Sequence, residues 1–138
     1  TAAKTPAIDP ERSRVMRAVK GTNTGPELAV RRFLWSAGLR YRLHRKNLPG
    51  RPDIVFPSKR IALFVHGCFW HGHEGCPRLR IPKTRRDYWV TKIAGNQARD
   101  VRARAALFAL GWTVLVVWEC EIASQDHLSA LLATIKSA

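Results

Sequence analysis

The stretch HGCFWHGHEGC, residues 66–76, holds three of the chain's five histidines and two of its three cysteines. Thiolates and imidazoles are the usual ligands of structural zinc, which takes four of them in a tetrahedron. The alternative is that the cysteines are buried core thiols, a common environment for free cysteine. The density of ligand types favours zinc. The three sulfurs and one nitrogen would come from Cys68, His73, Cys76 and Cys120.

Two further histidines of the stretch, His66 and His71, remain once four zinc ligands have been counted. An imidazole titrates near neutral pH and can give or take a proton during catalysis. His44 and His127 lie far away in the sequence and carry no motif, so we expect them to be surface or packing residues. The stretch therefore combines metal ligands with two candidate proton-transfer groups.

Asp53 follows a proline at the start of an apolar run and offers a hard oxygen ligand for Mg²⁺. Magnesium would stabilise negative charge on a phosphodiester and lower the pKa of a water molecule. In many metal-dependent nucleases the adjacent strand carries an acidic residue and a lysine. Here residues 64–66 take that place, so a backbone carbonyl and a histidine would serve instead. The alternative is a simple strand-entry turn.

Phe69 and Trp70 interrupt the ligands of the stretch, in a loop that we expect to be exposed and tied by metal. Apolar side chains inserted between base steps are a known way to deform DNA. The alternative is that the two rings only cover the zinc site. Composition alone does not decide between these roles.

The charge of the chain points to a polyanionic partner. There are 24 Lys and Arg against 10 Asp and Glu, for a net charge of +14. Nucleic acid is the leading partner and an anionic membrane surface the second. No apolar run is long enough to span a membrane and no secretory signal is visible. Because the odd cysteine count also argues against a disulfide framework, we expect a cytoplasmic protein.

Four helices are expected from apolar spacing and capping signals. Thr24 and Glu27 match a capping box with a proline in the first turn. In the long helix, Val101 and Phe108 are expected to share an apolar stripe with Ile93 and Ala105, opposite Arg and Lys. Asp126 is the expected cap of the last helix. The expected helices cover residues 11–20, 24–37, 84–111 and 127–136.

Short apolar runs between the helices predict strands. The runs at 60–67 and 112–120 are continuous and should be buried strands, whereas 41–44 alternates. A long crossover helix before a buried strand implies a parallel pair. The expected fold is therefore a single α/β domain over residues 1–138, with helices on both faces of a mixed sheet.

These motifs, taken together, resemble the very short patch repair (Vsr) endonucleases over nearly the whole chain. The matching segments, in order, are SRVMRAVK, TGPEL, LPGRPDIV, FVHGCFWHGH, PKTRRDYWVTKIAGN and GWTVLVVWEC. The resemblance implies a restriction-endonuclease-like, PD-(D/E)xK-type fold with catalytic Mg²⁺ and structural Zn²⁺. It also implies strand-specific nicking of DNA, 5′ of the T in a T:G mismatch left by deamination of 5-methylcytosine.

The same resemblance assigns roles to residues of this chain. Asp53 and the main-chain carbonyl of Val65 would hold Mg²⁺, and Val65 stands where some members have Thr. The implied catalytic residues are Asp53, His66, His71 and Glu27. The implied zinc ligands are Cys68, His73, Cys76 and Cys120. The implied DNA contacts are Met16, Phe69, Trp70, Lys92 and Asn96, with residues 1–20 as an arm and helix on the DNA.

Two other functions stay open at this stage. One is a nuclease of the same fold that cuts matched DNA or another mismatch. The other is a non-catalytic DNA-binding module stapled by zinc. In the leading hypothesis the partner is double-stranded DNA with a T:G mismatch, with mismatch-repair or methyltransferase proteins as further partners. We expect a bacterial protein that acts at the nucleoid as a monomer, because one basic domain with one site suffices.

Overall fold

The computed structural model describes residues 24–138 of the chain, and the helix expected at 11–20 lies outside them, as does Met16. A four-stranded sheet forms the centre, in the order β1-β2-β3-β4. Strands β1 (Arg42–Leu43), β2 (Ile54–Phe56) and β3 (Ile61–His66) are antiparallel neighbours. Strand β4 (Thr113–Trp118) runs parallel to β3, as the crossover helix predicted. No helix in the described part of the chain is long and apolar enough to cross a membrane.

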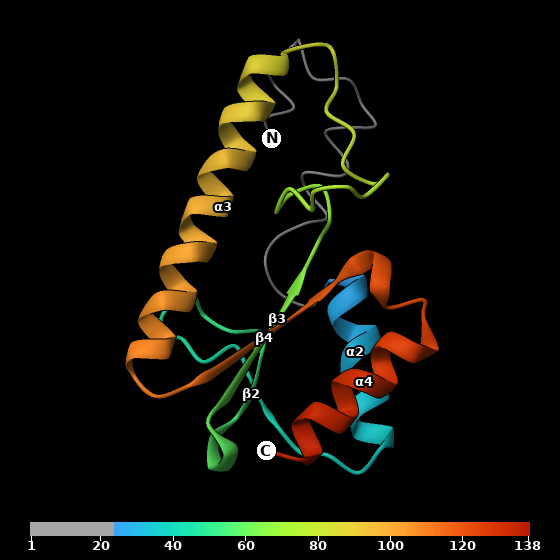
Figure 1. Ribbon diagram of the computed structural model, residues 1–138, viewed down its shortest axis with the longest axis vertical. Coiled ribbons are helices and arrows are strands. Elements are labelled where there is room, and N and C mark those ends of the chain that lie inside the picture. Colours follow the sequence, from blue (N-terminus) through green and yellow to red (C-terminus); the bar gives the residue numbers. More distant parts are fainter. Residues whose placement is uncertain (1–23) are drawn as a thin grey trace.

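Helices cover both faces of the sheet, which confirms the expected mixed α/β arrangement. Helix α3 (Arg86–Ala109) lies along one face, whereas α2 (Gly25–Ser36) and α4 (Gln125–Lys136) lie together on the other (Figure 1). Single turns of 3-10 helix, Pro57–Lys59 and Glu119–Glu121, follow β2 and β4. The N-terminal half of α3 extends beyond the strands and runs beside the loop after β3.

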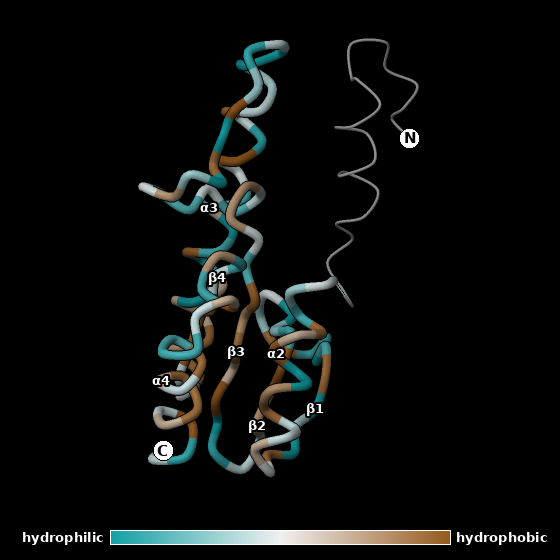
Figure 2. The backbone as a smooth tube through the Cα atoms, turned by 90° about the vertical axis from the view of Figure 1, so that its right-hand side faces the viewer, coloured by the Kyte–Doolittle hydropathy of each residue, from teal (hydrophilic) through white to brown (hydrophobic). Residues whose placement is uncertain are grey.

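Strand β3 is the most buried element, and its alternating side chains build two cores. Ile61 and Leu63 pack with residues of α2 and α4, while Ala62 and Phe64 pack with Leu107 of α3. The strand is apolar along most of its length (Figure 2). Because side chains alternate between faces, His66 follows Ala62 and Phe64 onto the face of α3. The run predicted to be buried on both sides is confirmed.

Helix α2 begins where the sequence predicted. The Thr24 hydroxyl accepts a hydrogen bond from the Glu27 N–H at 3.2 Å, and a proline occupies the first turn. The helix buries Val30 and Leu34 against the sheet. It therefore holds Glu27, in its first turn, in a buried position where 1% of the residue is exposed.

The apolar stripe expected on α3 has the wrong phase. Ile93 is buried, but Val101 and Phe108 are 55% and 80% exposed, and the end of the helix is instead buried through Leu107. Alanines lie between the larger apolar residues of α3. The apolar residues at helical spacing can therefore be assigned equally well to either of two faces of the helix. Only contact with β4 decides between them, and that contact falls on the side of Leu107.

Two further expectations about the C-terminal part need correction. Strand β4 is an edge strand, in which only Val117 is fully buried, so it is not buried as β3 is. Helix α4 is capped by Ser124, whose hydroxyl accepts from the His127 N–H, while Asp126 lies in the first turn. Both residue types favour an N-cap, and the sequence alone does not rank them.

Candidate active site and zinc centre

The site begins where β3 extends past the end of β2. The register pairs Ile54 with Leu63, so the next residues of β3 have no strand beside them on that edge. Asp53, immediately before β2, fills this position. Its carboxylate accepts a hydrogen bond from the Val65 N–H at 2.7 Å. A side chain therefore replaces the missing strand and stands at an open edge of the sheet.

The carboxyl group of Asp53 is held in a poorly solvated position. Burial raises its pKa from 3.8 to about 7, against the opposing effect of the Val65 N–H. Glu27, a second nearby carboxylate, raises the pKa further. A positive ion at this position would relieve both effects, which fits Asp53 as a cation ligand.

His66 and His71 lie together on the α3 side of this edge. Their rings stack with centroids 3.8 Å apart and planes 2° apart. Asp100 of α3 contacts both, at 2.6 Å from His71 Nδ1 and 3.9 Å from His66 Nε2. Asp100 was not predicted from the sequence, because an acidic residue within a long basic helix carries no local motif.

The two histidines differ in solvation. His66 is 4% exposed, and burial together with the neighbouring His71 lowers its pKa to about 4. Its Nδ1 is buried and has no hydrogen-bond partner within residues 24–138. His66 is therefore a neutral ring at physiological pH, with its Nδ1 shielded from solvent.

His44 lies beside Glu27 and Asp53, a position that the sequence did not predict. Its Nε2 lies 2.6 Å from a carboxylate oxygen of Glu27, and the two residues form a cluster with Asp53. The ligand atoms of the three lie within 4.8 Å of one another. His44 was expected to be a surface or packing residue, and it is half-buried against Glu27 in the lining of the cavity described below. The missing signal was the antiparallel pairing of β1 and β2, which brings position 44 beside Asp53.

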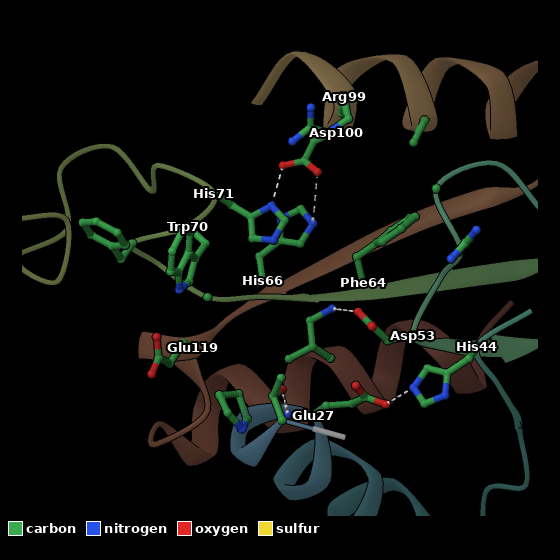
Figure 3. Close-up of a pocket in the computed structure, with 18 of the residues that line it drawn as sticks. Glu27, His44, Asp53, Phe64, His66, Trp70, His71, Arg99, Asp100 and Glu119 are labelled. Atoms are coloured by element: carbon green, nitrogen blue, oxygen red, sulfur yellow. Dashed lines mark hydrogen bonds and ion pairs between the residues drawn. The ribbon is translucent and has the colours of Figure 1, made fainter. Parts of the chain in front are cut away.

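A cavity of about 540 Å³ joins these groups. Figure 3 shows His66, His71 and Asp100 on the side of α3, and Glu27 and His44 on the side of α2. Carboxylates and imidazoles thus face one hollow from two sides, with Asp53 at the strand edge between them. Such a set can hold a divalent cation and move a proton near it.

The four expected zinc ligands come together although Cys120 is 44 positions beyond Cys76. Their ligand atoms lie within 4.8 Å of one another, and Cys120 Sγ is 3.4 Å from His73 Nδ1. Tetrahedral zinc separates sulfur and nitrogen ligands by about 3.5 Å, given its usual bond lengths. The geometry and the Cys₃His chemistry both fit zinc. Backbone N–H groups of Cys120 and Arg78 also point at Cys68 and Cys76 sulfurs.

Trp118, at the end of β4, lies between the Cys₃His cluster and the two histidines His66 and His71. Its ring stacks on His73 at 4.1 Å with planes 4° apart. The same ring meets His66 edge-on, with centroids 5.1 Å apart. Glu119, the next residue, accepts from the Cys68 N–H and also lines the cavity. The Cys₃His cluster and the candidate active site are therefore adjacent, with Trp118 and Glu119 in contact with both.

The two aromatic residues of the loop pack together and against α3. Phe69 and Trp70 meet edge-on at 5.3 Å, and each also contacts the buried ring of Trp89. Both are half-buried, so the loop is less exposed than expected. The ring that stacks on the zinc-ligand candidate His73 is Trp118. Trp89, which supports the pair, was not predicted from the sequence.

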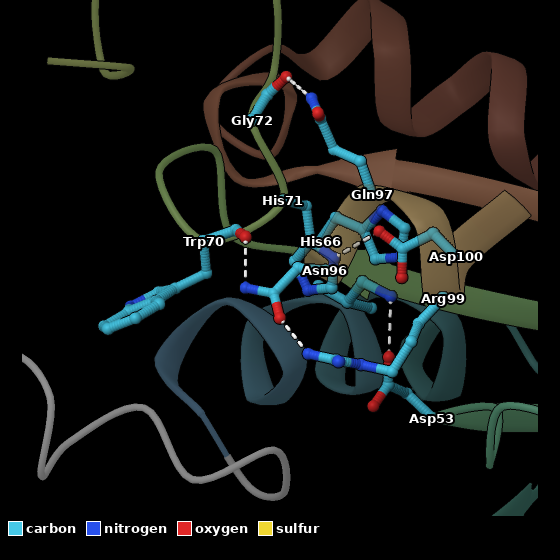
Figure 4. A network of polar contacts seen from close by, with 10 residues as sticks. Asp53, His66, Trp70, His71, Gly72, Asn96, Gln97, Arg99 and Asp100 are labelled. Carbon is cyan, nitrogen blue, oxygen red and sulfur yellow. Dashed lines mark hydrogen bonds and ion pairs between the residues drawn. The ribbon is translucent and has the colours of Figure 1, made fainter. Parts of the chain in front are cut away.

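Asn96 connects this loop to α3. Its amide donates to the Trp70 carbonyl at 2.8 Å, and its side-chain oxygen accepts from Arg99 (Figure 4). Gln97 likewise donates to the Gly72 carbonyl at 2.9 Å. Lys92, one turn before Asn96, is exposed and carries its charge outward. The loop is therefore fastened to α3 by side-chain amides at two points.

Comparison with known proteins identifies the family. The family described as DNA mismatch endonuclease Vsr matches residues 6–77. The DNA mismatch endonuclease Vsr of Escherichia coli is 42% identical over 118 residues, which cover 86% of this chain and 75% of that protein. The chain belongs to the Vsr DNA mismatch endonuclease family. As a member, it is a DNA endonuclease.

Nicking enzymes are found among the similar members of the family. The type II nicking enzyme V.XorIIP of Xanthomonas oryzae pv. oryzae is 58% identical over 132 residues, covering 95% of this chain and 96% of that protein. V.NmeAIP of Neisseria meningitidis, also a type II nicking enzyme, is 41% identical over 132 residues. This match covers 93% of this chain and 94% of V.NmeAIP. The resemblance recognised from the motifs is therefore confirmed.

Proposed function

We propose that this Vsr-family protein is a magnesium-dependent endonuclease that nicks one strand of double-stranded DNA, 5′ of the T in a T:G mismatch. The observation that carries this proposal is the cavity at the open edge of β3, where Asp53 lies between two sets of polar groups. The net charge of +14 suits a polyanionic substrate. Family membership supplies DNA as that substrate.

Asp53 and the Val65 carbonyl are the proposed ligands for Mg²⁺. In a strand, the N–H and C=O of one residue point to the same edge. Because the Val65 N–H is bonded to Asp53, the Val65 carbonyl faces the same opening. When bound, the ion would stabilise charge on the phosphate and lower the pKa of a water molecule. Glu27 would orient water bound near the ion.

His71 is the proposed proton-transfer group. Asp100, at 2.6 Å from its Nδ1, fixes the orientation of the ring and leaves Nε2 for the reaction. His66 stacks on His71 and presents a neutral ring beside it. In this scheme both histidines contact the reacting phosphodiester, while Asp100 acts through His71 as a positioning residue.

Mismatch recognition is proposed for Phe69 and Trp70 as an apolar wedge, with Lys92 and Asn96 as readers of the mismatched pair. The hydrogen bond from Asn96 to the Trp70 carbonyl supports a common location for wedge and reader. Zinc bound by the Cys₃His set would hold the loop on which the wedge lies. Met16 and the arm at residues 1–20 are proposed as a further DNA contact.

The fold is proposed to be restriction-endonuclease-like. The mixed sheet supports this, because a carboxylate before one strand faces the backbone of the adjacent longer strand. We further propose that the enzyme acts as a monomer in the bacterial cytoplasm, at the nucleoid, alongside mismatch-repair or methyltransferase proteins. A monomer is sufficient, because every group of the candidate site comes from one copy of residues 24–138.

The test is cleavage of end-labelled duplexes with Mg²⁺, each carrying a T:G pair in a different context. We expect one nick 5′ of the T and an intact opposite strand. Asp53→Asn should abolish cutting while retaining DNA binding, and Asp126→Asn, on exposed α4, should cut normally. Equal cutting of matched duplexes would refute mismatch specificity. The absence of any cutting would leave only the zinc-stapled binding module.

A further inference from the structure

His44 is held toward the active site by an unusual backbone conformation. Its φ angle is +47°, in the left-handed region, which costs free energy for a residue with a side chain. Its N–H donates to the Asp53 carbonyl at 3.2 Å, so the two residues are fixed relative to each other. In this conformation the imidazole points at Glu27, as Figure 3 shows.

The spacing of Glu27, His44 and Asp53 suits an ion. Around an octahedral cation with bonds of about 2.1 Å, adjacent ligand atoms are about 3.0 Å apart and opposite ones about 4.2 Å. The three ligand atoms lie within 4.8 Å, and the closest pair, His44 and Glu27, is 2.6 Å apart. His44 and Asp53 can therefore bond to one ion, with Glu27 beside them to orient its bound water.

We propose that His44 is a direct ligand of the divalent cation of this site, which is then held by imidazole nitrogen as well as carboxylate oxygen. The inference rests on the proposed metal-dependent nuclease function and specifies its cofactor. Imidazole favours first-row transition ions, whereas Mg²⁺ prefers oxygen ligands and water. The site therefore binds Mn²⁺ more tightly than Mg²⁺, and Mn²⁺ supports cutting at lower concentration.

The competing explanation is that His44 only pairs with Glu27 and holds that carboxylate in place. The Glu27 side chain is 2% exposed and that of His44 is 23% exposed, so the pair is partly sheltered from solvent. A purely structural pair would give no metal–nitrogen bond, and replacing His44 would leave the relative affinity for the two ions unchanged. A ligand gives the bond and a change in relative affinity, so the two explanations differ in a spectroscopic signature that does not depend on activity.

The experiment binds Mn²⁺ to the zinc-loaded protein and records its electron paramagnetic resonance, with pulsed detection of ¹⁴N coupling. We expect imidazole coupling in the native chain and in His71→Gln, and none in His44→Gln, whose amide can still bond to Glu27. His127→Gln, on exposed α4, is the matched control. Titration with competing Mg²⁺ should show the Mn²⁺ preference falling about tenfold or more in His44→Gln only.

Two outcomes would overturn the inference: no ¹⁴N coupling in the native chain, or coupling that persists in His44→Gln. The second would assign the ion to the cluster of His66, His71 and Asp100. Either result would leave nicking of T:G duplexes intact. Failure of the proposed function would look different, because Mn²⁺ would bind with nitrogen coupling and yet no duplex would be cut.

Discussion

The rings of His66 and His71 lie face to face, 3.8 Å apart between centroids, and Asp100 contacts both of them. Two stacked imidazoles do not carry positive charge together at little cost, because like charges at this distance repel strongly. Burial, together with repulsion from His71, lowers the pKa of His66 to about 4. His66 is therefore the neutral member of the stack, and His71 is the ring that bonds to Asp100 at 2.6 Å.

Replacing Asp100 by Asn should slow nicking without removing DNA binding. The amide keeps the size of the side chain but no longer offers a charged acceptor to His71 Nδ1, so the ring is held less firmly and we expect cleavage to fall about 10²-fold. Single-turnover cleavage and a binding titration on the same T:G duplex would measure the two effects separately. Asp126→Asn, an exposed acid-to-amide change, is the control. An unchanged cleavage rate would remove Asp100 from the mechanism.

Replacing Asp53 by Asn should stabilise the protein at alkaline pH when no Mg²⁺ is present. Because the folded pKa of Asp53 is about 7 against 3.8 ordinarily, the folded state binds this proton more tightly than the unfolded chain does. The native protein therefore loses stability as the pH rises from about 4 to about 7. Asn lacks this loss, and it can still accept from the Val65 N–H.

The expected gain for Asp53→Asn is on the order of 2 kcal/mol at about pH 8 relative to about pH 5. Urea unfolding of the zinc-loaded protein at the two pH values would measure it. Added Mg²⁺ should narrow the difference, because it stabilises the ionised native carboxylate. A pH-independent difference between the two proteins would contradict the raised pKa.

Replacing Cys120 by Ser should remove zinc and lower stability by several kcal/mol, since a structural zinc contributes folding free energy directly. Metal content by mass spectrometry and the melting temperature would record both changes. The surface variant Gln125→Ala serves as the control. A Cys120→Ser protein that retained one equivalent of zinc and its melting temperature would exclude Cys120 as a ligand.

Substitutions on the two sides of the C-terminal end of α3 should change the free energy of unfolding by very different amounts. Leu107→Ala should cost about 2–5 kcal/mol, because it opens a cavity in the core. Phe108→Lys, at a side chain 80% exposed, should change the free energy of unfolding by about 0.5 kcal/mol or less. Chemical denaturation of the two variants tests the phase of the helix. A large loss from Phe108→Lys would show that this ring is covered.

Much of the arrangement follows from the sequence, because its signals are local. Thr24 marks the start of α2, and the continuous apolar run at 60–67 predicts the central strand. The grouping of Cys68, His73, Cys76 and Cys120 was predicted from ligand chemistry and family resemblance. Each of these signals is contained in a short window or a recognisable motif.

The residues that were missed depend on contacts between distant segments. His44 reaches the site only through the pairing of β1 with β2, and Asp100 through the packing of α3 beside His71. Neither has a pattern of neighbours that distinguishes it from a surface residue. The burial of Leu107 instead of Phe108 was equally hidden, because it depends on where α3 meets β4. Assembly of the fold, not local preference, selects these side chains.

The overhang of β3 beyond β2 also bears on how the protein avoids self-association. An unpaired strand edge is a template on which the strand of another molecule can add. At Val65 the template is blocked by the carboxylate of Asp53, which takes the N–H that an incoming strand would need. The carboxylate proposed to bind the catalytic ion thus also prevents another strand from pairing with this edge of β3. Loss of the acceptor, as in Asp53→Ala, would leave a protein that is both inactive and more prone to aggregate.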